Sequence, residues 1–219
     1  MSANKDYEFN EKIHSILLNP YLSKESFTNN INLIKKYNIK NISTSLNYLS
    51  YVKDNFPLSN IKIHTLISYP FADLPNNFVQ ELIDYAKDAG SEAIEYVPKF
   101  FTLSNNKDDE FARDIENVSK LDLPITLIFN KKQLSKEIFT QAINISLELG
   151  IASFQFGDGF GQYLGVNEIK EIMNLLGKNN FIKIVGGIKT IANIKEILEA
   201  GAYCIGTSYY HDIFQELKN

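Results

Sequence analysis

The sequence has little of what would tie it to an oxidising compartment, a membrane or a nucleic acid. It has one cysteine, Cys204, so no disulfide can form within the chain. No apolar run approaches the ~20 residues that span a bilayer, and residues 1–12 contain no apolar segment of a secretory signal. The net charge is −4, and Lys and Arg are scattered among acidic residues. These absences predict a cytoplasmic protein that binds neither membranes nor nucleic acid.

Histidines are also few, and they show no metal-binding pattern. The three histidines, His14, His64 and His211, are far apart in the sequence and have no Cys, Asp or Glu cluster beside them. The sequence therefore predicts no metal site. We interpret His64 and His211 as structural or exposed, whereas His14 lies in an apolar run where structural and functional interpretations both stay open. Cys204, in the run AYCIG, is interpreted as a small buried hydrophobe.

Short apolar runs alternate with amphipathic segments along the whole chain. The runs cover residues 12–18, 39–45, 61–69, 92–98, 123–129, 151–157, 181–187 and 202–208. Segments of helical period lie at 22–37, 75–88, 108–119, 135–149, 166–176, 191–200 and 209–217. Runs rich in Ile, Val and Phe are typical of strands buried on both faces, as in a parallel sheet. The alternation indicates consecutive βα units with right-handed crossovers.

Eight such strands predict an α/β fold, a (β/α)8 TIM barrel, formed by a single domain over residues 1–219. A chain of 219 residues is within the range of this fold, which starts near 200. Closure leaves no exposed strand edge, whereas the alternative, an open doubly wound sheet, would need two. Because catalytic groups in such barrels lie where strands end and βα loops begin, the carboxyl ends of the strands are the place to look for function.

The last two strands end in glycine-containing sequences that suit an anion. The seventh ends VGGIKT and the eighth IGTS, each just before a helical segment. Glycine lets an anion approach the backbone, and free N–H groups at a helix start point toward it. The predicted phosphate-binding residues are Gly186, Gly187, Gly206, Thr207 and Ser208, the last two through their hydroxyls. The simpler alternative is that the glycines make tight turns and Ser208 caps a helix.

Two charged residues lie inside apolar strands, Glu95 in AIEYVP and Lys183 in FIKIVGG. A buried charge is costly unless it is paired, so we expect the two to meet across the barrel interior. Period-2 alternation places Glu95, Val97 and Lys99 on one side of their strand. A buried lysine whose amine is freed of its proton can attack a carbonyl. The alternative is that Lys183 extends from the bottom of the barrel into solvent.

Taken in order, these segments resemble the deoxyribose-phosphate aldolases, class I aldolases built on a (β/α)8 barrel. HSILLNP resembles the family's DHTLLKP, HTLISYPFA resembles TVIGFPLG, and AIEYVPKF resembles EIDMVINI. IKIVGGIKT resembles VKASGGIRT, and AGAYCIGTS resembles AGASRIGTS. The resemblance runs from about residue 12 to residue 210, and its last two matches are the most specific.

The resemblance implies a reaction that uses lysine chemistry without a cofactor. One lysine forms an imine with acetaldehyde, a second depresses its pKa, and a carboxylate acts with water in proton transfer. Matched residue by residue, the second lysine is Lys183 and the carboxylate is Glu95. The implied partner is a small phosphorylated sugar or aldehyde. The oligomeric state is left open, with a homodimer as one option.

Departures from the family pattern are concentrated at the reacting centre. The imine-forming lysine falls on Gln155, whose amide cannot form a Schiff base. The first-strand aspartate falls on His14, the glutamate of the fifth strand falls on Asn130, and Asp158 replaces a hydroxyl near the expected phosphate. A carboxylate there would repel an anion.

Three hypotheses follow. The first is an aldolase that cleaves 2-deoxyribose 5-phosphate to acetaldehyde and glyceraldehyde 3-phosphate, with Lys183 or else Lys99 as the imine lysine. The second is a catalytically silent relative that binds a phosphosugar or another small ligand. The third is a lyase or isomerase that uses His14 and Glu95 without an imine, since one barrel hosts many chemistries.

Overall fold

The computed structural model describes residues 10–19, 21–57, 60–157, 163–177 and 179–217. Its eight strands are β1 (Ile13–Leu17), β2 (Asn41–Ser45), β3 (Lys62–Ile67), β4 (Ala93–Tyr96), β5 (Ile125–Phe129), β6 (Ser153–Phe156), β7 (Phe181–Val185) and β8 (Cys204–Thr207). They form a closed barrel in sequence order, every neighbouring pair is parallel, and β8 pairs back onto β1. The predicted TIM barrel is confirmed, and the open sheet is excluded.

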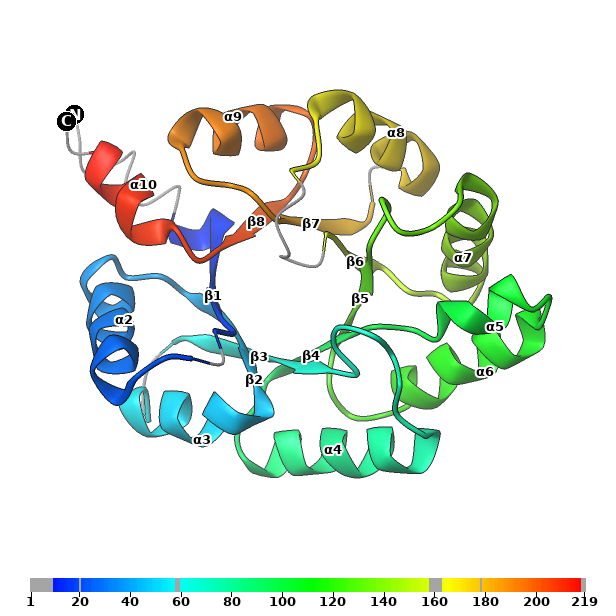
Figure 1. The fold of residues 1–219 in the computed structure, drawn as a ribbon, viewed down its shortest axis with the longest axis horizontal. Helices are drawn as coiled ribbons and strands as arrows, with labels where there is room; N and C mark the ends of the chain where they lie inside the picture. The colour runs from blue at the N-terminus through cyan, green and yellow to red at the C-terminus, as the bar shows by residue number, and fades with distance from the viewer. Residues whose placement is uncertain (1–9, 20, 58–59, 158–162, 178, 218–219) are drawn as a thin grey trace.

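Helices surround the barrel as an outer layer (Figure 1). They are α2 (Lys24–Lys36), α3 (Leu46–Asn55), α4 (Asn76–Asp88), α5 (Phe100–Ser104), α6 (Asp108–Ser119), α7 (Lys136–Glu148), α8 (Val166–Leu176), α9 (Ile191–Glu199) and α10 (Tyr210–Glu216). Hydroxyl side chains at Ser23, Ser135 and Thr190 each accept a hydrogen bond from a backbone N–H of the first turn, which starts α2, α7 and α9.

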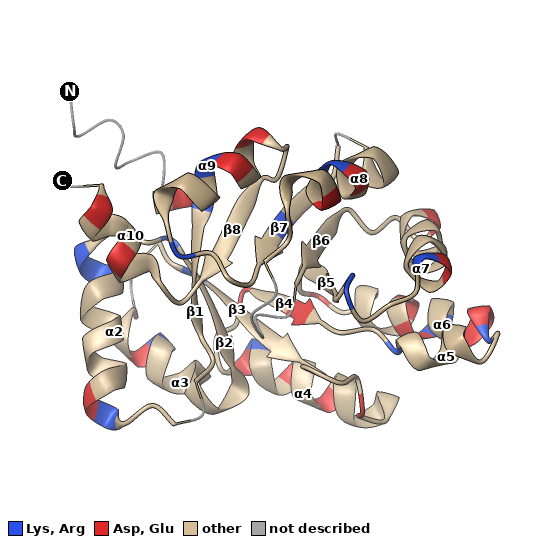
Figure 2. Ribbon diagram, turned by 45° about the horizontal axis from the view of Figure 1, so that its top comes forward, with Lys and Arg blue, Asp and Glu red and all other residues tan. Residues whose placement is uncertain are grey.

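The sequence did not predict α3 and α5. α5 has only five residues, and α3 buries only Leu49 and Val52, so neither gives a strong helical period. The strands and the other helices lie where they were predicted, with ends that differ by a few residues. Among the described residues, no helix is long and apolar enough to span a bilayer. Both basic and acidic residues occur on the outer helices (Figure 2).

Period-2 alternation gives each strand an apolar side that faces outward and a second side, facing inward, that can carry polar residues. On the outward side Phe129, Phe154 and Phe156 stack among themselves and against Phe139 of α7, with ring centroids 5.8–6.3 Å apart. This layer between strands and helices is the main hydrophobic core. Because the helices cover the outward side, the inward side is free to carry the polar groups described below.

A second, smaller apolar cluster lies inside the barrel mouth. It consists of Leu66, Ala72, Val97 and Ile128, with Leu18, Tyr69 and Phe100 packed against it. Leu66 of β3 lies two residues beyond His64, and Val97, which directly follows β4, lies two residues beyond Glu95, so both are one layer nearer the carboxyl ends. The cluster therefore covers the polar interior from the side of the βα loops.

Gly157 is required by the close approach of two neighbouring chain segments. It follows β6 with a φ of 93°, and a Cβ there would lie 1.9 Å from the carbonyl oxygen of Val185. Gly150 also has a positive φ, 78°, but a Cβ on that residue would meet nothing within 4 Å.

We expect Gly157→Ala to lower the free energy of unfolding by at least about 3 kcal/mol, because backbone strain adds to a clash that no side-chain movement relieves. Gly150→Ala, which adds only the strain, should cost about 1 kcal/mol. Urea denaturation of both variants measures the difference. Equal losses in the two variants would contradict the steric explanation.

Candidate active site

The centre of the barrel holds a buried ion pair, as the sequence predicted. Lys183 Nζ of β7 lies 2.5 Å from Glu95 Oε1 of β4, and each side chain is 1% exposed. Nζ also donates a hydrogen bond of 2.8 Å to Ser43 Oγ, whose hydroxyl donates to the same Glu95 oxygen at 2.9 Å. The alternative that Lys183 extends into solvent is excluded. Ser43, which links the pair to β2, was not identified from the sequence.

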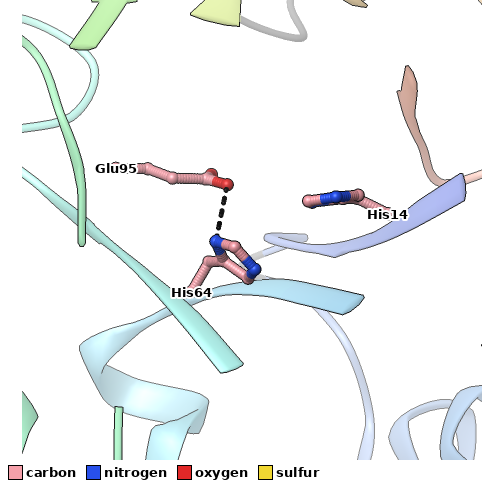
Figure 3. A group of neighbouring side chains, drawn as sticks. All are labelled: His14, His64 and Glu95. Carbon is pink, nitrogen blue, oxygen red and sulfur yellow. Dashed lines mark ion pairs between the residues drawn. The ribbon is translucent and has the colours of Figure 1, made fainter. Parts of the chain in front are cut away.

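Two histidine rings complete the polar centre. His14 of β1 and His64 of β3 have ring centroids 4.9 Å apart, and His64 Nδ1 lies 3.7 Å from Glu95 Oε1. Figure 3 shows both rings beside the carboxylate, one from each of these strands. His64, which was interpreted as structural or exposed, is not exposed: only 13% of its side chain is accessible, and it belongs to this cluster.

The expectation that no carboxylate lies near the histidines is also wrong. Ligand atoms of His14, His64 and Glu95 all lie within 4.8 Å of one another. Spacing along the chain could not reveal this, since the residues come from three strands that only barrel closure brings together. In the structure His64, Glu95, Ser43 and Lys183 each occupy the third position of their strand, which the bounds of the predicted runs did not reveal.

Burial and charge set the protonation of the cluster. Burial, with the charges of Lys183 and His64, holds the pKa of His14 well below its ordinary value. Burial is also the main reason that the pKa of His64 is lowered to about 4. For Glu95, burial acts to raise the pKa, but the charge of Lys183 and the hydrogen bonds from Lys183 and Ser43 outweigh it and leave the pKa lowered. The resting centre thus holds an ionised carboxylate and two neutral imidazoles.

Gln155 lies beside this pair on β6, in register with Lys183 of β7. Its amide nitrogen donates a hydrogen bond of 3.2 Å to the carbonyl oxygen of Gly157, and its amide oxygen is buried without a hydrogen-bond partner. The position that the resemblance gives to the imine lysine is therefore next to Lys183 and inside the barrel, but it is occupied by a group that cannot react with a carbonyl.

Lys99, the second candidate for the imine lysine, does not reach the centre. β4 ends at Tyr96, and the Lys99 amine bonds Asn76 of α4 and lies 3.7 Å from Asp114 of α6. The prediction that Lys99 follows Glu95 and Val97 on the inward side is wrong, because the strand alternation stops before it. Lys99 instead joins two outer helices.

The loops after β7 and β8 lie together at the predicted anion-binding end. Gly186 and Gly187 have φ angles of 109° and 67°, and Ser208 is exposed at the end of β8. The Thr207 hydroxyl donates to the carbonyl oxygen of Ile188 at 2.7 Å and accepts from the Tyr209 N–H at 2.9 Å. Its hydrogen is therefore already used to join the two loops, contrary to the predicted donation to a phosphate.

Gly206 has a packing role that the sequence did not reveal. A Cβ on this residue would lie 2.9 Å from Lys183 Cε and 2.8 Å from Val185 Cγ2. The glycine thus leaves room for the lysine stem inside the barrel. Beyond it, the exposed Lys189 holds its amine 5.0 Å from the ring centroid of Tyr209, which brings a positive charge to the same end and was not singled out from the sequence. Asp158, whose charge was expected to disfavour an anion, lies outside the described residues.

Comparison with known proteins shows which proteins the whole chain resembles. No family model matches the chain. A deoxyribose-phosphate aldolase of Mycoplasmopsis pulmonis is 28% identical over 208 residues, which cover 92% of this chain and 93% of the relative. Those of Dictyoglomus turgidum and Staphylococcus carnosus are 26% and 24% identical over 92% and 97% of this chain, and 94% and 98% of each relative.

This chain is similar to the deoxyribose-phosphate aldolases over almost its whole length. The predicted resemblance is confirmed. Among solved structures, the tetrameric deoxyribose phosphate aldolase of Aeropyrum pernix gives a TM-score of 0.87 at 16% identity, over all of this chain and 94% of that one. An aldolase named QR15 gives 0.87 at 18% identity, over 96% of each chain. These structures support the barrel fold of the deoxyribose-phosphate aldolases for this chain.

Removing one member of the central ion pair should destabilise the protein strongly. We expect Lys183→Met and Glu95→Gln each to lower the free energy of unfolding by roughly 3–5 kcal/mol, because each leaves a buried group without its partner. The double variant should lose clearly less than the sum of the two. Urea denaturation of all four proteins gives the coupling energy. Additive losses would mean that the pair contributes nothing beyond its separate side chains.

The stability of the protein should fall as the pH drops from about 6.5 toward 4. The unfolded chain protonates its histidines near pH 6.5, whereas His64 in the folded chain resists protonation until about pH 4. The stabilisation is therefore complete above pH 6.5 and is lost below it, by about 1.4 kcal/mol per pH unit for each such histidine. His64→Gln should show a shallower slope in urea denaturation at several pH values. An unchanged slope would refute the contribution of His64.

Proposed function

We propose that this chain is a deoxyribose-phosphate aldolase-like lyase that cleaves or forms a carbon–carbon bond in a small phosphorylated sugar, with Lys183 as the imine-forming amine. The observation that carries the proposal is the direct contact between Lys183 Nζ and Glu95 Oε1, 2.5 Å, at the family's inner positions on β7 and β4. The names of the curated relatives favour this activity over a silent binding protein or an imine-independent isomerase.

An ammonium group cannot attack a carbonyl, and Glu95 is placed to accept the proton that Lys183 must first lose. As an aldehyde approaches, Glu95 accepts a proton from Nζ, and the freed amine attacks the carbonyl carbon. Glu95 then returns this proton to the oxygen and passes on a second proton from the nitrogen, so that the oxygen leaves as water and a protonated imine forms. Because proton transfer within the pair leaves its net charge at zero, the low-dielectric interior does not oppose this step.

For 2-deoxyribose 5-phosphate, the same pair can complete the cleavage. The C3 hydroxyl gives its proton to a base, the C2–C3 bond breaks, and the electron pair moves toward the imine nitrogen to give an enamine. Protonation at C2 and hydrolysis release acetaldehyde and free Lys183, while glyceraldehyde 3-phosphate leaves from the other half. Glu95 and an ordered water suit the proton transfers of both halves.

The surroundings of the pair suit a substrate whose reacting end is small and uncharged and whose other end is anionic. Leu66, Val97 and Ile128 lie over the polar centre and limit access of water, which would hydrolyse an imine. Gly186, Gly187 and Ser208 lie at the ends of β7 and β8, with Lys189 nearby. A phosphate held by the N–H groups and charge of these loops would leave the aldehyde end directed into the barrel.

Reductive trapping tests the proposal. Incubation with acetaldehyde, followed by borohydride, should add one two-carbon adduct to the protein, and 2-deoxyribose 5-phosphate should add that adduct or the uncleaved five-carbon sugar phosphate. Peptide mapping should place either adduct on Lys183. Lys183→Met should give no adduct, whereas Lys99→Met, which removes an amine outside the barrel, should trap normally. A protein that gives no adduct while a deoxyribose-phosphate aldolase is trapped in parallel is not an imine-forming enzyme.

Gln155→Lys provides a second, opposite test of the same proposal. It puts an amine beside Lys183, at the position of the family's imine lysine, and the two neighbouring cations should each lower the pKa of the other. We expect faster trapping and a gain in cleavage of at least about tenfold, since a larger fraction of amine is then unprotonated. Gln155→Met, which adds no amine, is the matched control.

A further inference from the structure

Three ligand-type atoms in the barrel centre are buried without hydrogen-bond partners. They are His14 Nδ1, His64 Nδ1 and Glu95 Oε2. His14 is 3% exposed and Glu95 1%. A buried polar atom without a partner is costly and calls for an explanation. The aldolase proposal uses Glu95 Oε1 and leaves all three atoms unexplained.

We propose that His14, His64 and Glu95 form a binding site for one divalent transition-metal ion of the zinc type. The ligand atoms of these residues lie within 4.8 Å of one another, and the side chains converge from β1, β3 and β4 (Figure 3). Two imidazoles and one carboxylate suit Zn²⁺ or Co²⁺, which take three protein ligands and keep one position open for water. Ca²⁺ and Mg²⁺ prefer sites made of oxygen ligands alone.

Neighbouring groups already orient two of the three ligands. His64 Nε2 lies 3.3 Å from the side-chain oxygen of Asn41, which can only accept, so Nε2 carries the hydrogen and the lone pair is on Nδ1. Ser43 and Lys183 both bond Glu95 Oε1, which leaves Oε2 for the ion. Outer hydrogen bonds of this kind fix metal ligands in place in known sites.

The amino ends of the strands are the side from which we expect an ion to reach the site. His64 is the most exposed of the three ligands, with 13% of its side chain accessible. Its partner Asn41 lies two residues before Ser43 on β2, which places it one layer nearer the amino end. The apolar cluster of Leu66, Val97 and Ile128 covers the opposite side. An ion would therefore enter from the end of the barrel away from the βα loops.

The positive charge of Lys183 disfavours metal binding, since the ammonium group and the metal ion would share one carboxylate. Its amine contacts Glu95 Oε1 at 2.5 Å, so an ion on Oε2 would lie close to the ammonium group. The repulsion lowers the affinity but leaves the ligand geometry intact. This gives the site an unusual signature: replacing Lys183 with an uncharged side chain should strengthen metal binding.

Calorimetric titration of the metal-free full chain with Zn²⁺ tests the site. We expect one ion per chain, with affinity at least about 100-fold weaker in His14→Ala and His64→Ala, and about tenfold weaker in Asn41→Ala. Lys183→Met should bind at least about tenfold more tightly. His211→Ala is the matched control, because His211 lies on α10 and contacts Tyr37 instead of the cluster.

Co²⁺ absorption identifies the ligands independently. The expected spectrum has visible bands without thiolate charge transfer, whereas a thiolate band that disappears in Cys204→Ser would overturn the assignment. The assignment would also be overturned if wild type and both histidine variants bound Zn²⁺ with the same affinity. It would equally be overturned if neither wild type nor Lys183→Met bound Zn²⁺. If His14→Ala does not fold, His64→Gln and Asn41→Ala decide. None of these measurements uses aldolase activity, so the site can fail while the lysine chemistry stands.

Discussion

The ion pair between Glu95 and Lys183 is the interaction on which the rest of this barrel interior depends. Two opposite charges, each 1% exposed, are tolerable in a low-dielectric core only because they neutralise each other. Their contact fixes the position of Ser43, uses one oxygen of Glu95, and lies beside two histidines that burial keeps neutral. Gly206 leaves room for the pair, since any side chain there would collide with the lysine stem.

Compared with the pattern of the deoxyribose-phosphate aldolases, the resemblance puts an amide, Gln155, at the position of one lysine and an imidazole, His14, at the position of an aspartate. Gln155 stands beside Lys183 where the family's imine lysine is expected. An amide at this position places no second positive charge beside Lys183. In the proposed imine chemistry Glu95, which contacts Lys183 Nζ, is the group that accepts the proton. The imidazoles, in turn, bring ligand atoms that an imine mechanism does not need.

The loops after β7 and β8 show how one sequence pattern can hold residues with different roles. The segments VGGIKT and IGTS together have the pattern of a single anion-binding set. In the structure Gly186 and Gly187 have positive φ angles, which glycine adopts without strain, and Ser208 is exposed. Thr207 instead joins the two loops, and Gly206 makes space for Lys183. Within one motif region, therefore, some residues set the loop conformation, one is exposed and others serve packing.

The sequence by itself determined the barrel, because hydrophobic alternation and strand spacing are local properties that survive without knowledge of contacts. It also determined the pairing of Glu95 with Lys183, since two isolated charges in buried strands have few other partners. Only the tertiary structure decided that His64 belongs to the centre, that Lys99 does not, and that His14, His64 and Glu95 meet. The physical reason is barrel closure. His64 and Glu95 follow His14 by 50 and 81 residues in the chain, and closure turns their three strands toward one common interior.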